Sequence, residues 1–321
     1  KYQNFKTVPV STEIEVDVSA LTVLKKLKNV SSHCYMLESN DDANNTGRYT
    51  FLGYDPKAEV SCTNYNVRFI DSFGVKNYTG DPRKYIKQML DEHKAPKIEN
   101  LPTFTGGLFG YDYVKYSEPS LKLDAHDDGN FKDVDLMLFD KVIAFDNREN
   151  KIILIVNIQT QEVDENYAIA LKELEIMKNI ILNGDEAEIE KPKLKTEFKP
   201  LFDGERYAKM VEKAKHYIKE GDIFQVVLSN RLEAEMDGSL FGTYEILRKL
   251  NPSPYMFYFS SDDIEMAGAS PETLVKLENG KLSTYPLAGT RPRGKNKAED
   301  DELEKELLKD PKELAEHNML V

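Results

Sequence analysis

Two glutamates near the end of the chain have the spacing of a metal-binding helix face. Glu313 and Glu316 are three residues apart, and residues three apart share one face of a helix. Asp310 suits the N-cap of that helix and Pro311 suits its first position. Paired carboxylates suit a hard cation such as Mg²⁺. A capping role for Glu313 and a solvated Glu316 explain the same pattern, so both interpretations stay open.

A loop at residues 283–295 has the residue types to hold a polyanion. Gly289 lets a ligand approach the backbone, and Thr290 adds a hydroxyl. Arg291 and Arg293, which flank a proline, could hold carboxylates. These residues indicate either a pocket for a small polyanion or a basic surface loop that balances acidic neighbours.

A hairpin brings one more carboxylate to this loop. Asn279 and Gly280 lie between two strand-like runs, and Asn-Gly is typical of a two-residue hairpin turn because both residues need positive φ. The register that follows from such a turn places Glu272 opposite Leu287. We therefore expect Glu272 to lie at the same end of the hairpin as Gly289.

The elements that must position these residues indicate an α+β fold. Before residue 183 the chain is predicted to form strands and a few helices, including a hairpin within 141–158. Residues 205–221 predict an amphipathic helix, and residues 222–236 predict a strand with apolar side chains on one face. This mixture is typical of antiparallel sheets with helices on the outside.

A charged segment with two prolines, residues 183–205, is the best candidate linker. We therefore expect an N-terminal region at 1–190 and a second region at 200–321. The chain starts without Met and stops within an apolar run, so we expect the second region to be incomplete at its C-terminal end.

Composition excludes several classes of function. The formal net charge of −13 argues against a nucleic-acid or anionic-membrane partner. Cys34 and Cys62 are too few for a disulfide framework or a cysteine zinc site, which favours a reducing cytoplasm. The longest aliphatic run, 152–156, is too short to span a bilayer.

Eight motifs in one order carry a resemblance. They read YMLESN, GRYTFLGYDP, TGGLFGYDYVKY, GDIFQVVLSNR, NPSPYMFYF, GASPE, PLAGTRPRG and DPKELAEHNMLV. The set resembles the chorismate-utilising enzymes, and within them the large subunits (component I) of anthranilate synthases. The resemblance covers the chain from about Tyr35 to Val321. It implies two large packed antiparallel β-sheets with helices on the outside.

The resemblance also implies a reaction and its residues. Ammonia adds to chorismate, water and pyruvate leave, and anthranilate forms in the first committed step of tryptophan biosynthesis. A separate glutamine amidotransferase subunit would supply the ammonia, and Mg²⁺ would be required. By resemblance, Gly289 and Thr290 contact chorismate and Glu316 is a metal ligand. Glu313 would be a partner of that ligand or bind through water, and Glu272 would be a general acid near the leaving hydroxyl.

Two positions favour one reaction among the relatives. Aminodeoxychorismate synthases typically have a nucleophilic lysine where this chain has Ala288, which cannot attack a substrate. Isochorismate and salicylate synthases typically have a lysine that activates water where this chain has Gln225, and an amide is no base at neutral pH. Ammonia needs no such activation. Aminodeoxychorismate synthase remains the alternative within the family.

Two further motifs indicate a regulatory site. Glu38 and Ser39 follow an apolar strand, where a carboxylate and a hydroxyl can meet an ammonium group. Pro254 interrupts sheet pairing beside Tyr255 and Met256, whose side chains could cover an indole ring. An ordinary edge strand explains the same residues. The resemblance implies that these five residues bind L-tryptophan as a feedback inhibitor.

Relatives continue well beyond the last helix, so the resemblance leaves part of the catalytic pocket outside these residues. We therefore expect a polypeptide of these 321 residues to be inactive alone. The competing hypothesis is a non-catalytic fragment that at most binds tryptophan or a partner subunit.

Overall fold

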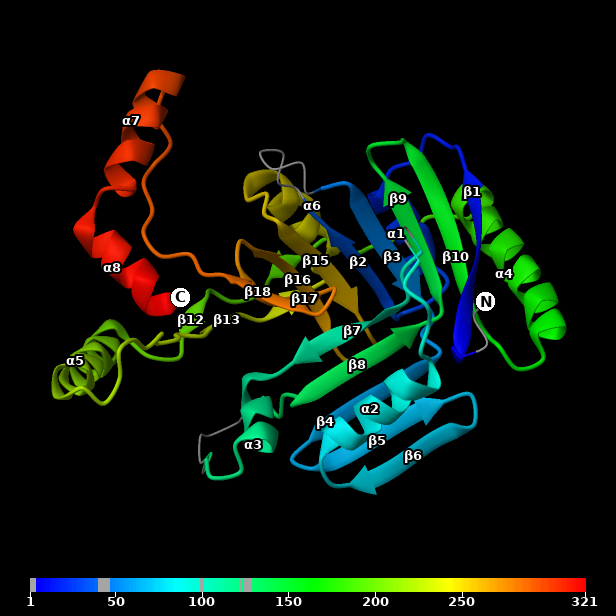
Figure 1. Ribbon diagram of the computed structural model, residues 1–321, viewed down its shortest axis with the longest axis horizontal. Helices are drawn as coiled ribbons and strands as arrows, with labels where there is room; N and C mark the ends of the chain where they lie inside the picture. Colours follow the sequence, from blue (N-terminus) through cyan, green and yellow to red (C-terminus); the bar gives the residue numbers. More distant parts are fainter. Residues whose placement is uncertain (1–3, 40–46, 99–100, 122, 124–128) are drawn as a thin grey trace.

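The protein has an α+β fold built around two antiparallel sheets (Figure 1). A computed structural model describes residues 4–39, 47–98, 101–121, 123 and 129–321. One sheet has seven strands in the order β1-β10-β9-β3-β2-β15-β16, and the other has five in the order β6-β5-β4-β8-β7. The predicted fold class is therefore confirmed.

The seven-stranded sheet combines strands from both ends of the chain. Its strands are, in spatial order, β1 (Thr7–Ile14), β10 (Lys151–Gln159), β9 (Lys141–Asp146), β3 (Tyr49–Tyr54), β2 (Cys34–Glu38), β15 (Tyr255–Ser260) and β16 (Glu265–Ser270). The predicted hairpin at 141–158 is confirmed by β9 and β10, in which Asp146 pairs with Lys151. β15 and β16 follow the expected linker yet join this sheet, so one sheet contains strands of both expected regions. The division at 190–200 stays a prediction.

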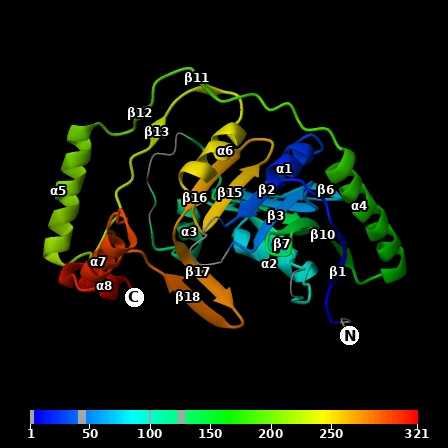
Figure 2. The same cartoon turned by 90° about the horizontal axis from the view of Figure 1, so that it is seen from above.

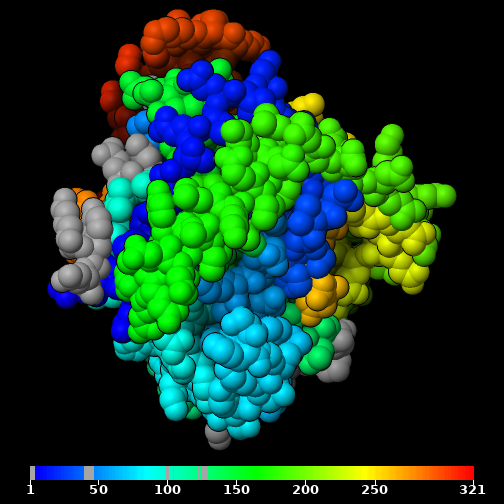
Figure 3. All heavy atoms as spheres, turned by 90° about the vertical axis from the view of Figure 1, so that its right-hand side faces the viewer, coloured from blue at the N-terminus to red at the C-terminus, as the bar shows by residue number. Residues whose placement is uncertain are grey.

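Three helices cover one face of this sheet: α1 (Ala20–Lys28), α4 (Val163–Asn183) and α6 (Phe241–Leu250). The apolar positions of α4 that repeat at helical spacing, such as Ala170, Leu174 and Met177, are buried against the strands. Figure 3 shows α4 in green and α1 in blue spread over this face. Burial of these side chains supplies most of the stability of the region.

The five-stranded sheet has a smaller core of its own. Its strands are β4 (Ala58–Thr63), β5 (Asn66–Asp71), β6 (Gly74–Thr79), β7 (Phe104–Phe109) and β8 (Val134–Phe139). α2 (Pro82–Glu92) buries Met89 against it, and the short helix α3 (Val114–Ser117), which follows a 3₁₀ turn at Tyr111–Tyr113, buries Tyr116. A cluster that includes Tyr35, Met137 and Phe259 joins the two sheets.

The remaining elements belong to neither of these two sheets (Figures 1 and 2). They are β11 (Lys193–Leu194), β12 (Lys199–Pro200), α5 (Gly204–Glu220), β13 (Leu232–Glu233), β14 (Met236–Asp237), β17 (Thr273–Glu278), β18 (Lys281–Tyr285), α7 (Lys297–Leu307) and α8 (Pro311–Leu320). All residues of 182–240 and 261–321 are described, and none of them is buried. Among the helices of the described residues, none is both long and apolar enough to cross a membrane.

One element differs from its prediction. The helix at 205–221 is confirmed by α5, which ends at Gly221 with a φ of 82°. The strand predicted at 222–236 is wrong over 222–231, which has no regular structure. Phe224 and Val227 are each 84% exposed there. A strand needs a neighbour that bonds its backbone groups, and 222–231 has no strand neighbour among the described residues.

Candidate functional site

The hairpin β17–β18 has the predicted turn. Asn279 and Gly280 have φ values of 52° and 79°, as the two central residues of such a turn require. Pairing begins as predicted, and then the register shifts, so that Thr273 faces Tyr285. The predicted ladder alignment of Glu272 with Leu287 is therefore wrong by one residue.

The side chain of Glu272 nevertheless reaches the expected neighbour. Its Oε1 accepts a hydrogen bond from the backbone N–H of Leu287 at 2.9 Å. Glu272 is exposed, so its carboxylate is available on the outside of the hairpin. The structure thus ties the predicted general acid to the start of the loop that leads to Gly289.

α8 places a carboxylate directly against Gly289. Its first turn is capped by Asp310, whose Oδ1 accepts from the N–H groups of Lys312 and Glu313 at 2.9 and 3.3 Å. These bonds hold the pKa of Asp310 below its ordinary value. A Cβ atom on Gly289 would lie 2.0 Å from Oε2 of Glu313, which is closer than atoms can approach. A Cβ atom at position 289 would displace the Glu313 side chain from this position.

Arg291 lies between three carboxylates of the protein. Its Nη2 is 2.8 Å from Oδ2 of Asp310, its Nε is 3.2 Å from Oε1 of Glu306, and its Nη1 is 3.6 Å from Oε1 of Glu313. These carboxylates raise the pKa of Arg291, with the hydrogen bond to Glu306 as the largest cause. Arg291 therefore binds the protein itself, whereas Arg293 is 89% exposed and pairs with Asp300 at 2.5 Å.

Thr290 and Glu316 lie next to the contact between Gly289 and Glu313, Thr290 in the loop and Glu316 on α8. Thr290 is exposed, and Glu316 is half-buried one helical turn after Glu313. Carboxylate oxygens are the ligands that Mg²⁺ prefers, and this ion commonly takes one or two protein carboxylates with water and substrate. Glu316 fits that chemistry. Within the described ranges, however, no group of three His, Cys, Asp or Glu residues is arranged to hold a metal ion.

The two halves of the predicted regulatory site meet in the seven-stranded sheet. β2 and β15 are antiparallel neighbours, and Glu38 lies directly opposite Met256. Ser39 follows β2 and Pro254 precedes β15, so both lie at the same end of the strand pair. Sequence motifs far apart in the chain are thus brought to one place, as the resemblance requires.

The side chains there differ in exposure and in partners. Met256 is 1% exposed, whereas Tyr255 is 44% exposed and its hydroxyl lies 2.6 Å from Oγ1 of Thr273. Tyr255 therefore links β15 to Thr273, the first residue of β17, which directly follows Glu272. The contact connects the regulatory strands with the hairpin.

Glu38 already has partners on α6, which the sequence analysis missed. The carboxylate is 6% exposed, and its Oε1 accepts from the hydroxyl of Tyr244 and from Nε of Arg248, both at 2.7 Å. Nη2 of Arg248 also pairs with Oε2. Tyr244 and Arg248 are four residues apart, on one helix face. That spacing shows in the sequence that Tyr244 and Arg248 share a helix face. It does not show which strand this face packs against.

Gln225 is not placed at the hairpin. It is exposed within the segment that has no regular structure. The chemical argument from its amide group therefore rests on the sequence alone.

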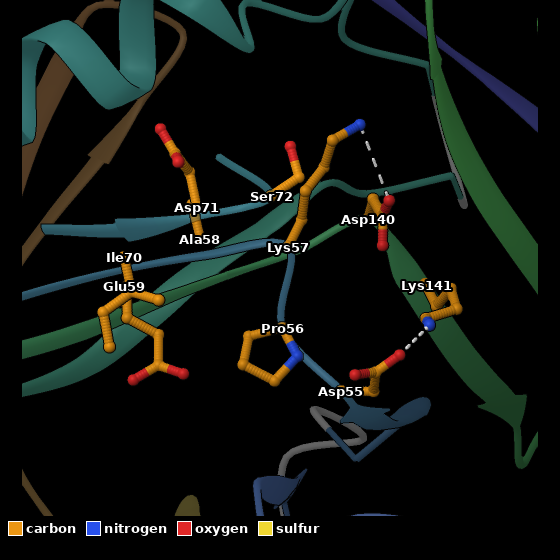
Figure 4. Close-up of a pocket in the computed structure, with 10 residues that line it drawn as sticks. All are labelled: Asp55, Pro56, Lys57, Ala58, Glu59, Ile70, Asp71, Ser72, Asp140 and Lys141. Atoms are coloured by element: carbon orange, nitrogen blue, oxygen red, sulfur yellow. Dashed lines mark hydrogen bonds and ion pairs between the residues drawn. The ribbon is translucent and has the colours of Figure 1, made fainter. Parts of the chain in front are cut away.

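A separate hollow of about 320 Å³ lies between the two sheets (Figure 4). Two ion pairs lie within its lining: Lys141 contacts Asp55 at 2.5 Å, and Lys57 lies 3.7 Å from Asp140. None of the predicted site residues lines this hollow. It therefore differs from the hairpin site in both place and chemistry.

Comparison with known proteins identifies the family of the chain. A family model described as chorismate binding enzyme matches residues 12–321. The chain belongs to the chorismate-binding enzyme family. The family predicted from the sequence motifs is therefore confirmed.

Curated relatives of this chorismate-binding enzyme are named anthranilate synthase component 1. The protein from Acetivibrio thermocellus is 36% identical over 331 residues, which cover 99% of this chain and 67% of that protein. The protein from Aquifex aeolicus (strain VF5) is 38% identical over 333 residues, with coverages of 99% and 66%. The chain thus spans about two thirds of the length of these relatives.

Solved structures agree with the fold. Anthranilate synthase component I from Streptococcus pneumoniae TIGR4 superposes with a TM-score of 0.65 at 30% identity, covering 85% of this chain and 60% of that chain. The menaquinone-specific isochorismate synthase MenF from Escherichia coli gives a TM-score of 0.59 at 18% identity, covering 99% of this chain and 64% of that chain, and supports the fold alone. The assignments of individual site residues in this chorismate-binding enzyme stay predictions.

Proposed function

We propose that this chorismate-binding enzyme acts as an anthranilate synthase component I, which converts chorismate and ammonia to anthranilate, pyruvate and water. The contact between Gly289 and Glu313 carries the proposal, because it joins the predicted chorismate loop to the predicted metal helix. Relatives that are 36 and 38% identical and named for this activity support it.

The substrate explains why the loop and the helix meet. Chorismate carries two carboxylates at neutral pH. The backbone at Gly289 and the hydroxyl of Thr290 would bind one end of it with little rearrangement. Glu316 would hold Mg²⁺, and the bound ion would supply positive charge for a substrate carboxylate. The glycine has no side chain to block this approach.

Glu272 would donate the proton that the departing hydroxyl needs. Its carboxyl group is oriented by Leu287, so it lies at the entrance of the same loop. Loss of the hydroxyl as water requires one proton, and the incoming ammonia brings the nitrogen that replaces it. Ala288 and Gln225 offer neither a nucleophile nor a base, which favours ammonia over an enzyme lysine or water.

Partners, regulation and location form the rest of the proposal. A glutamine amidotransferase subunit would deliver the ammonia, and L-tryptophan would inhibit by binding beside Glu38, Ser39 and Met256. The pairing of Glu38 with Met256 supports a joint site there. The low cysteine count supports a cytoplasmic enzyme.

The experiment measures anthranilate fluorescence with chorismate, ammonium and Mg²⁺ supplied to the full gene product. We expect signal from that protein and none from the 321-residue chain alone, because the chain spans about two thirds of the length of the relatives named for this activity. Formation of aminodeoxychorismate instead would favour the alternative enzyme. Tryptophan binding by calorimetry without any turnover of the full gene product would favour a non-catalytic role.

A further inference from the structure

Arg291, in the proposed chorismate loop, forms ion pairs with three carboxylates of the protein. Its guanidinium contacts carboxylates from three places: Glu306 at the end of α7, Asp310 at the N-cap of α8, and Glu313 in the first turn of α8. Nη1 also donates to the backbone carbonyl of Thr290 at 3.0 Å. One side chain therefore ties the proposed chorismate loop to both helices that follow it.

We propose that Arg291 is a positioning residue of the chorismate site, which holds the start of α8, and with it Glu313 and Glu316, beside Gly289. The consequence for turnover rests on the proposed function, whereas the consequence for α8 does not.

Apolar packing cannot do this work here. No residue of α7 or α8 is buried, so no core fixes the angle at which α8 meets the loop. The cap formed by Oδ1 of Asp310 bonds only to N–H groups of α8 itself, so it stabilises the helix without fixing the position of the helix relative to the loop. The contacts that join this loop to α8 are those of Arg291 and the close approach of Glu313 to Gly289.

The geometry requires arginine. Exposed ion pairs are individually weak, but the Arg291 side chain is only 21% exposed and is shared by three acceptors. A planar guanidinium presents five donors in a fixed fork, whereas a lysine ammonium acts as one point charge. A lysine at position 291 could keep one of the three ion pairs but could not bridge all three carboxylates at once.

The same contacts occupy the hydrogen-bond donors of Arg291 that a ligand could otherwise use. Its Nε, Nη1 and Nη2 all face protein acceptors, so the guanidinium is not directed at a substrate carboxylate. Glu313 is held between Arg291 and Gly289, which leaves Glu316, one turn further on, to face a metal ion. Arg291 thus acts on the metal only through the placement of α8.

The first test needs neither chorismate nor Mg²⁺. Amide hydrogen exchange of residues 311–320 is compared in the 321-residue chain and in Arg291→Ala, Arg291→Lys and Glu306→Gln. Arg293→Ala is the matched control, because Arg293 is 89% exposed and pairs with Asp300 on α7, which is not one of the three carboxylates around Arg291. We expect exchange to rise about tenfold in Arg291→Ala, less in Arg291→Lys and Glu306→Gln, and not in the control.

The second test uses the full gene product. We expect the Mg²⁺ concentration for half-maximal anthranilate formation to rise about tenfold in Arg291→Ala, with a smaller change in Arg291→Lys. Thermal unfolding shows whether each variant is folded, and Glu306→Gln keeps the arginine in case Arg291→Ala does not fold.

Two outcomes overturn the proposal. Unchanged exchange over 311–320 in the Arg291 variants would show that α8 is held by something else. A fall in the Mg²⁺ midpoint would show that Arg291 competes with the metal and does not position its ligand. Faster exchange in a gene product that makes no anthranilate would instead support the positioning role and contradict the proposed function.

Discussion

The sheet body and the C-terminal arm, residues 271–321, are built on different principles. In the body, side chains such as Val23, Leu52 and Leu154 are fully buried, and three helices cover one sheet. In the arm, which is described throughout, no residue is buried. Hydrogen bonds and ion pairs, such as those of Glu272 and Arg291, hold its elements together instead. Stability and chemistry are therefore separated: the body keeps the chain folded, and the arm carries the candidate site.

The two regions are nevertheless connected. β15 and β16 belong to the body and lead directly into β17, and the hydroxyl of Tyr255 contacts Thr273 at 2.6 Å. The strand pair with the predicted tryptophan site is therefore the part of the body next to the candidate active site. A change at Glu38 or Met256 has a short path to Glu272.

The largest expected effect is on activity and comes from the arm. Gly289→Ala places a Cβ atom 2.0 Å from Oε2 of Glu313, so the Glu313 side chain must leave its position against the loop. We expect the rate of anthranilate formation by the full gene product to fall about 10²-fold. Thermal unfolding should be unchanged, because no core is touched. Gly204→Ala is the control, since a Cβ there meets nothing within 4 Å. Equal activity of the two variants would remove the Gly289–Glu313 contact from the site.

The next effect is on stability and comes from the body. Leu52→Ala empties a fully buried position, and we expect the free energy of unfolding to fall by about 2–5 kcal/mol in urea titrations. The matched variant Leu274→Ala removes a side chain that is 89% exposed in the arm, and should change it by less than about 0.5 kcal/mol. A large loss in Leu274→Ala would show that the arm has a packed core after all.

A third effect depends on pH and belongs to the body. Asp146 is 1% exposed and pairs with Arg48 at 2.8 Å, and the hydrogen bond from Arg48 is the main reason why its pKa falls from 3.8 to about 2. The charged form is favoured in the folded state, so its contribution to stability is complete above about pH 5 and is lost as the pH falls from about 5 to about 1. That contribution is about 2 kcal/mol.

Asp146→Asn should therefore lower the free energy of unfolding at pH 7 and flatten its dependence on pH between about 5 and about 1. Asp91→Asn is the control, because Asp91 is 63% exposed and pairs only with Lys87 within its own helix. Parallel pH curves for the wild-type chain and Asp146→Asn would contradict the assignment.

The smallest effect tests the border between the regions. Tyr244→Phe removes one hydrogen bond to the buried carboxylate of Glu38 and leaves Arg248 in place. We expect a loss of roughly 1.5 kcal/mol in the free energy of unfolding, and weaker inhibition by L-tryptophan in the full gene product. Unaltered inhibition would separate Glu38 from the regulatory site.

Local chemistry made much of the arm predictable. The Asn279-Gly280 turn and the Asp310 cap depend on neighbouring residues only, and both were predicted correctly. The register shift between Thr273 and Lys276 was not predictable, because it occurs next to a tertiary contact of Thr273 with Tyr255. The strand predicted at 222–236 failed over 222–231 because the sequence pattern does not show whether a neighbouring strand is present.

The body shows the same limit. The α+β class followed from the order of apolar runs, and the family followed from motifs. The partners of Glu38 did not follow, because Tyr244 and Arg248 reach it only after α6 packs on the sheet. Sequence patterns thus located the candidate residues, while the contacts between distant elements came from the structure.

The most direct test is amide hydrogen exchange of the full gene product with and without chorismate and Mg²⁺. We expect slower exchange over 286–294 and 311–320 when both are present, and no change over the core strands at 134–159. Slower exchange confined to the body, with the loop and α8 unaffected, would contradict the placement of the chorismate site in the arm.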